Sequence, residues 1–136
     1  MENILIFLKQ HSRDMDDLEK EKFYFWNLGK LLTELNFYPL RRISIFLIFY
    51  YGNKVLISTR NLNNILLFYQ TFSEKDPLIE YPNISWYQYI VLIHTKMTQA
   101  ERFLLLEGCQ NEKWTTLQLK REIMKIKNRQ TKEDML

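Results

Sequence analysis

The sequence contains few of the residues that interrupt helices or build chemical sites. Its 136 residues include three glycines, three prolines, two histidines and one cysteine. So few chain breakers, in a chain rich in leucine, isoleucine, lysine and glutamate, favour helices over a many-stranded β-sandwich. We therefore expect an all-α fold, a compact bundle of six or seven short helices at 1–128, followed by a frayed polar tail at 129–136.

Disulfides, membrane spans and targeting signals are also missing. The single cysteine, Cys109, cannot form an internal disulfide, and its position on an expected helix favours a buried thiol. The longest apolar run, 43–51, is about half as long as a membrane-spanning helix. Glu2 stands where a signal peptide would be basic. We expect a cytoplasmic protein with no membrane partner.

Groups that catalyse reactions or bind metals are sparse. His11 and His94 are far apart in the sequence, and neither belongs to a metal-ligand spacing such as HExxH. The motifs CxxC, GxSxG and the P-loop do not occur. The acidic residues are not arranged on expected strands, as a metal-dependent nuclease cluster requires. We therefore expect no catalytic residue, no metal, no cofactor and no small-molecule substrate.

Strong helix-start signals lie between residues 84 and 123. In three places a serine or threonine is followed three residues later by glutamine or glutamate: Ser85 and Gln88, Thr98 and Glu101, Thr115 and Gln118. In such a capping box the hydroxyl accepts from the third helical N–H, and the longer side chain accepts from the N–H of the cap residue. Apolar periodicity follows each box, which predicts helices at about 85–96, 98–111 and 115–128.

The first half of the chain predicts four further helices, with a long loop at 73–83. The second of them begins at Asp16 or Asp17 and contains Gly29 within its apolar stripe, which indicates close approach of another helix. The third spans 40–51 between a proline and a glycine. A buried strand at 43–51 is the alternative, because its sequence ISIFLIFYY has high β-propensity.

Two segments predict contact with double-stranded DNA. The helix at 40–51 and the helix that begins at Ser58 have the order of a helix-turn-helix, in which the second helix reads the major groove. Arg60, Asn61 and Asn64 suit that role, because arginine can pair with guanine and asparagine with adenine. The alternative is that Ser58 only caps the helix and the asparagines are solvated.

The second segment lies near the end of the chain, where Lys120, Arg121 and Lys125 could contact DNA phosphates. Lys127, Arg129 and Lys132 add to this positive charge. A solvated amphipathic helix is an equal alternative.

The segment 43–51 is apolar at every helical register. A helix of this kind lies at the centre of its domain or meets a partner. We interpret it as an interaction surface for a second copy of the chain or another subunit, with four candidate residues: Ile45, Phe46, Ile48 and Phe49.

Three segments carry a family pattern. They are Phe25-Trp26-Asn27-Leu28-Gly29-Lys30; Ile43-Ser44, Tyr51-Gly52 and Ser58-Thr-Arg-Asn-Leu62; and Ile84-Ser85-Trp86 with Tyr89, Glu101-Arg102 and Trp114-Thr115. With them, the chain resembles the N-terminal helical domain of YhcG-type PD-(D/E)XK nucleases. In that family this domain precedes a nuclease domain and is associated with DNA binding or assembly. Here Asn63 and Asn64 occupy positions that the family tends to fill with arginine, which weakens the electrostatic case for DNA.

The resemblance implies a non-catalytic DNA-binding and assembly module, with a nuclease subunit as a partner, since no position of the chain matches the nuclease core. The alternative is a protein-interaction domain that forms homodimers through 43–51 without nucleic acid. A third interpretation is a fragment of an active nuclease.

Overall fold

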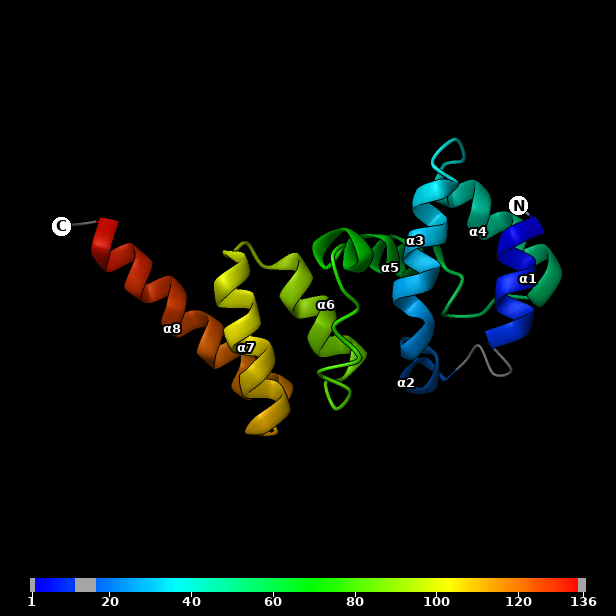
Figure 1. Cartoon of the computed structure of the whole chain (residues 1–136). Helices are drawn as coiled ribbons and strands as arrows, with labels where there is room; N and C mark the ends of the chain where they lie inside the picture. The colour runs from blue at the N-terminus through cyan, green and yellow to red at the C-terminus, as the bar shows by residue number, and fades with distance from the viewer. Residues whose placement is uncertain (1, 12–16, 135–136) are drawn as a thin grey trace. The chain divides into compact units, whose positions relative to one another are not determined.

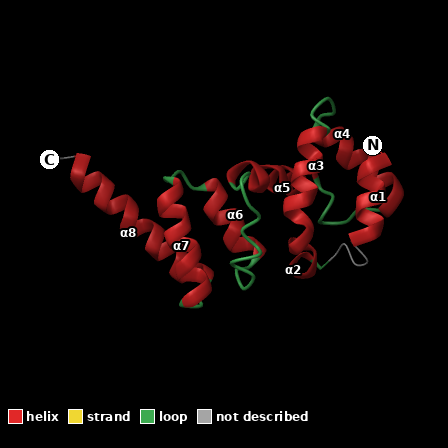
Figure 2. Cartoon of the chain, in the orientation of Figure 1, coloured by secondary structure: helices red, strands yellow, loops and turns green. Residues whose placement is uncertain are grey.

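The computed structural model describes residues 2–11 and 17–134, and every regular element within these ranges is helical (Figure 2). The elements are α1 (Glu2–His11), α2 (Leu18–Glu21), the 3₁₀-helix η1 (Lys22–Tyr24), α3 (Phe25–Glu34), α4 (Leu40–Tyr51), α5 (Thr59–Thr71), α6 (Trp86–His94), α7 (Gln99–Asn111) and α8 (Thr116–Asp134) (Figure 1). The predicted all-α fold is confirmed. The alternative of a strand at 43–51 is wrong, because this segment lies within α4.

The chain divides into two compact units, Met1–Asp76 and Pro77–Leu136. Both contain fully buried large side chains, such as Phe25 and Phe68 in the first unit and Trp86 and Tyr89 in the second. The predicted single domain at 1–128 stays a prediction.

The close approach predicted at Gly29 is confirmed in the first unit. A Cβ atom at this position would lie 2.6 Å from Cβ of Tyr69 and 2.7 Å from the carbonyl oxygen of Ile65, so α3 and α5 pack almost backbone to backbone. Beside this contact, Nε1–H of Trp26 donates to the carbonyl oxygen of Phe72 at 2.9 Å. The rings of Trp26 and Tyr69 pack edge to face, with ring centres 5.1 Å apart. The predicted helix before residue 35 is divided into α2, η1 and α3, and Asp17 caps its start.

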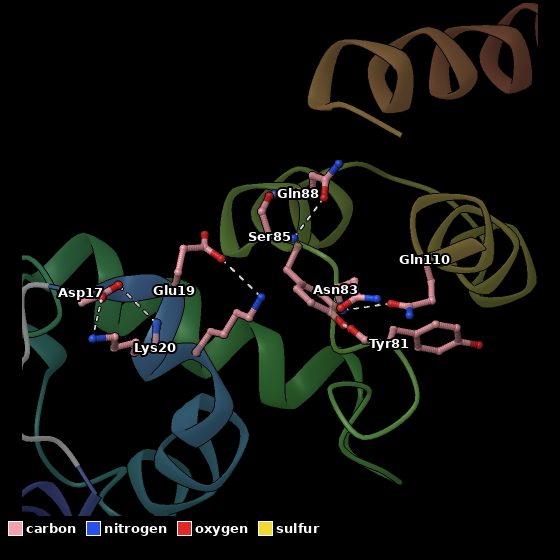
Figure 3. Close-up of polar contacts among 10 residues, drawn as sticks. Asp17, Glu19, Lys20, Tyr81, Asn83, Ser85, Gln88 and Gln110 are labelled. Carbon is pink, nitrogen blue, oxygen red and sulfur yellow. Dashed lines mark hydrogen bonds and ion pairs between the residues drawn. The ribbon is translucent and has the colours of Figure 1, made fainter. Parts of the chain in front are cut away.

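All three predicted capping boxes are present in the second unit. The cap N–H donates to the longer side chain at 3.0 Å for Ser85, 2.8 Å for Thr98 and 2.7 Å for Thr115. The reciprocal bonds from the third helical N–H to the cap hydroxyls measure 3.1, 3.1 and 3.2 Å. Figure 3 shows the pair at Ser85 and Gln88. Local sequence alone therefore determines where α6, α7 and α8 begin.

The preceding loop and the last helix are also held by side-chain bonds. The N–H of Asn83 donates to Oε1 of Gln110 on α7 at 3.0 Å, as Figure 3 shows. On α8, Nε2 of Gln130 donates to Oε2 of Glu101 at 3.0 Å. The helix continues to Asp134, beyond the predicted end at 128, so the segment 129–134, expected as part of a frayed tail, is helical.

Candidate interaction surface

Helix α4 is bounded by the two residues that the sequence indicated. Pro39 has φ −58° and ψ 143°, an extended conformation directly before the first helical residue. Gly52 has φ 78°, in the region that glycine adopts without strain, and its N–H donates to the carbonyl oxygen of Ile48 at 2.8 Å. The helix is therefore fixed at both ends by local chemistry.

One side of α4 is buried and the opposite side faces solvent. Ile43, Ser44 and Leu47 are buried. Opposite them, at helical spacing, Arg42, Ile45 and Phe49 form an exposed row, in which Ile45 is 58% and Phe49 is 83% exposed. Helix α4 therefore has one buried side and one apolar side that is exposed to solvent.

Aromatic rings gather at the carboxyl end of this free side. Tyr50 is 56% exposed, and its ring centre lies 5.0 Å from that of Phe46 and 5.5 Å from that of Phe49. We call Ile45, Phe46, Phe49 and Tyr50 the α4 face. Of the four predicted interaction residues, Ile45 and Phe49 are exposed, whereas Phe46 and Ile48 are half-buried. Tyr50 was absent from that prediction, although its spacing of four from Phe46 places the two rings together.

The charges on α4 are all positive and lie at its amino end. Arg41 and Arg42 are exposed, and the helix contains no acidic residue. Cations at the amino end of a helix are unfavourable to that helix, because its dipole is positive there. Helix α4 therefore carries the exposed aromatic rings of the α4 face together with two arginines whose charges are unfavourable to its own dipole.

The prediction that Asn61 and Asn64 face DNA bases is wrong, because both side chains are buried, at 5% and 7% exposure. The chain before α5 turns inward and buries Leu56 and Ile57. Nδ2 of Asn61 donates to the carbonyl oxygen of Leu56 at 3.0 Å. A buried carbonyl needs such a donor, so the asparagine serves the fold. The alternative of solvated asparagines is wrong for the same reason.

Ser44 and Ser58 also stabilise the connection between α4 and α5. Oγ of Ser44 donates to the carbonyl oxygen of Ile57 at 2.6 Å, which links α4 to the chain that leads into α5. Oγ of Ser58 accepts from the N–H of Asn61 at 3.2 Å, so the interpretation of Ser58 as a helix cap is confirmed. Arg60 alone among the predicted base-reading residues is exposed.

We expect Asn61→Asp to lower the free energy of unfolding by about 2 kcal/mol, because the new carboxylate cannot donate to the buried Leu56 carbonyl. Chemical denaturation followed by tryptophan fluorescence measures this loss. Asn63→Asp is the matched control, because Asn63 is exposed on the same helix turn. Equal stability of the two variants would contradict the structural role of Asn61.

The basic candidates of the second unit are all exposed on α8. Nζ of Lys120 lies 5.5 Å from the centre of the Tyr87 ring, and Nζ of Lys125 forms an ion pair of 2.8 Å with Glu122. Arg121 lies beside them in the sequence and is exposed. These three side chains belong to one helix and could contact the phosphates of a polyanion. Arg60 belongs to the other unit.

Cysteine and histidine are the other residue types that could carry reactivity. Cys109 is buried, and burial raises the pKa of its thiol to about 11, which keeps it protonated and unreactive at neutral pH. The expectation of a buried thiol is confirmed. His94 is exposed at the carboxyl end of α6, while the side chain of His11 lies outside the described residues.

The Glu101-Arg102 pair also serves the scaffold. The Thr98 N–H donates to the Glu101 carboxylate and lowers its pKa. The capping bond therefore stabilises the fold at neutral pH and is lost as the pH falls through this lowered pKa. Nε of Arg102 donates to the carbonyl oxygen of Leu92 at 3.2 Å near the end of α6, and burial lowers the Arg102 pKa.

Within the described ranges, no group of three or more histidine, cysteine, aspartate and glutamate side chains is placed to hold a metal ion. No helix in the same ranges is long and apolar enough to cross a membrane. An open groove of about 490 Å³ runs along α1 and α3, with Asn27, Lys30 and Glu34 among its lining residues.

Comparisons with family models, with curated proteins and with solved structures found no match. The resemblance to the helical domain of YhcG-type nucleases therefore stays a prediction.

Proposed function

We propose that this chain is a non-catalytic protein-interaction module that associates with its partner through the α4 face. The exposure of Phe49 carries this proposal. A phenylalanine that is held almost entirely in water costs about 1.5–3 kcal/mol relative to its burial, and a bound partner would recover this free energy. The neighbouring helix α5 shows the contrast, because its exposed side chains are all polar: Thr59, Arg60, Asn63 and Gln70.

Photo-crosslinking tests this function. We expect p-benzoylphenylalanine at position 49 to form covalent protein adducts in living cells, because the ring would lie inside the interface. The same substitution at Tyr87 is the matched control, since Tyr87 is an exposed aromatic residue of the second unit. Adducts of the same intensity at both positions would indicate non-specific cross-linking of exposed aromatic positions and would contradict a specific α4 interface. Absence of any adduct at position 49 would overturn the proposal.

Binding to the backbone of double-stranded DNA is a second candidate function. The exposed cations Lys120, Arg121 and Lys125 on α8 favour it. Base reading by Asn61 and Asn64 is not part of this proposal, because their side chains are buried. The predicted relation to nuclease-associated domains is compatible with either function.

A salt series tests this second function. We expect the affinity for duplex DNA to fall linearly with salt on a log–log scale, and Arg121→Gln to reduce the slope by about 1 through loss of one phosphate contact. Lys30→Gln is the control, since Lys30 is exposed on α3 in the other unit. An identical slope for wild type and Arg121→Gln would exclude Arg121 from the contact. Absence of binding at low salt would exclude the function.

A further inference from the structure

We propose that the partner of the α4 face is a second copy of this chain, bound by antiparallel pairing of two α4 helices that places Arg42 of each copy against Phe49 of the other. This inference rests on the proposed function, since it names the partner and the geometry of the same surface.

The position of the exposed row leads to this geometry. Arg42, Ile45 and Phe49 lie opposite the buried side of α4. The helix spans Leu40–Tyr51, so its midpoint falls between Ile45 and Phe46. A two-fold axis through that midpoint brings position 42 of one copy level with position 49 of the other. Both residues belong to the same outermost row, so they meet face to face in this isologous arrangement.

The chemistry of the two residues is complementary. The face of an aromatic ring attracts a guanidinium group, and arginine is the cation most often found there. Phe49 is 83% exposed, and its ring lies at an interplanar angle of 80° to the Tyr50 ring, so most of its surface is open to a cation. A surface that carries cations and no acidic residue can therefore still bind itself.

The helix dipole selects the antiparallel orientation. Arg41 and Arg42 lie at the positive amino end of their own helix, where they are unfavourable. In the antiparallel pair, both arginines lie beside the negative carboxyl end of the other α4. In a parallel pair, four arginines would meet at one end and repel one another. The same charges thus favour one orientation and oppose the other.

The size of the face indicates a weak dimer. An exposed aromatic side chain can bury about 150–250 Å², so the α4 face provides on the order of 500 Å² per copy. Stable interfaces bury about 800 Å² per partner. We therefore expect a concentration-dependent dimer with a dissociation constant on the order of 10 μM.

Disulfide trapping on the full chain tests the geometry. Two differently tagged preparations, one with Arg42→Cys and one with Phe49→Cys, are mixed and oxidised. We expect the mixed 42–49 disulfide to dominate. Ile45→Cys lies near the proposed two-fold axis and should cross-link to itself. The native Cys109 is buried, so wild-type chain oxidised in the same way should remain uncrosslinked.

A charge series by analytical ultracentrifugation tests the chemistry. We expect Arg42→Gln to raise the dimer dissociation constant at least tenfold, and Arg42→Lys to restore most of the affinity, because a cation over the ring is regained. Arg60→Gln should change nothing. Phe49→Leu, which keeps an apolar residue and removes the ring, should weaken the dimer about as much as Arg42→Gln. Unchanged folding of each variant is verified by circular dichroism.

The outcomes separate the two proposals. Self-linkage at 42 and at 49 without the mixed product would show a parallel dimer, which overturns the antiparallel geometry and leaves the interaction function standing. A monomer at all concentrations, with cellular adducts at position 49 to another protein, would overturn the second copy as partner. A monomer without any adduct at position 49 would overturn both.

Discussion

Gly29→Ala should lower the free energy of unfolding by about 2 kcal/mol, although alanine is the better helix former. On propensity alone, the substitution would stabilise α3 by about 1 kcal/mol. The new methyl group, however, would lie 2.6 Å from Cβ of Tyr69 and 2.7 Å from the carbonyl oxygen of Ile65. Both atoms are fixed to the α5 backbone, so the two helices must move apart, and overpacking of this kind costs about 1–3 kcal/mol or more. The steric cost therefore exceeds the gain in propensity.

Urea denaturation measures this loss, and Trp26 reports on it because its indole lies at the same helix pair. Asn27→Ala is the matched control, since Asn27 is exposed on α3 and should gain slightly from helix propensity. If Gly29→Ala is as stable as Asn27→Ala, the close packing of α3 on α5 is incorrect.

Gln88→Glu is the second substitution with a large expected effect, about 2 kcal/mol at pH 7. Gln88 is buried and uses both ends of its amide. Its Oε1 accepts from the N–H of Ser85 within the capping box, and its Nε2 donates to the carbonyl oxygen of Trp114 at 2.8 Å. Glutamate would preserve the first bond, but its carboxylate would face the Trp114 oxygen without a proton to donate.

The pH dependence of this loss follows from the same contact. Burial and the facing carbonyl raise the folded-state pKa of the introduced carboxyl above its unfolded value. The penalty is therefore complete above the folded pKa and disappears as the pH falls below the unfolded pKa of about 4.3, where a protonated carboxyl can donate to Trp114. The stability difference between wild type and variant should shrink steadily from pH 7 to pH 4.

Gln118→Glu separates this effect from capping itself. Gln118 occupies the same position in the third box, accepts from the N–H of Thr115 and is exposed. Its replacement should be neutral or slightly stabilising at pH 7, because a carboxylate is favourable near a helix start. Equal losses in the free energy of unfolding for the two variants would show that the hydrogen bond from Gln88 to Trp114 does not contribute to stability.

Two kinds of prediction differ in how well the sequence supports them. Helix boundaries depend on neighbours in the chain, and the boxes at Ser85, Thr98 and Thr115 appear as predicted. The roles of polar residues within helices depend on distant segments. Asn61 and Asn64 are residue types that suit the DNA-reading helix of a helix-turn-helix. Both side chains are nevertheless buried in the fold, next to the buried segment at Leu56 and Ile57.

The segments on which the predicted resemblance to the YhcG-type helical domain rests illustrate the same distinction. Trp26, Gly29, Glu101 and Arg102 all support contacts within or between helices. Trp114 packs against Gly108, where an added Cβ would lie 2.2 Å from its ring. The pattern thus consists largely of residues that hold helices together, and it predicts a scaffold better than it predicts an activity.

The sequence by itself determined the all-helical class, the starts of α5 to α8, and the limits of α4 at Pro39 and Gly52, because caps, prolines and glycines act over three or four residues. Tertiary structure decided which polar residues are buried and which side of α4 is free. An apolar helix can bury any of its sides, and tertiary packing, which includes the contact with α5, selects Ile43 and Leu47 for the core and leaves Phe49 in solvent.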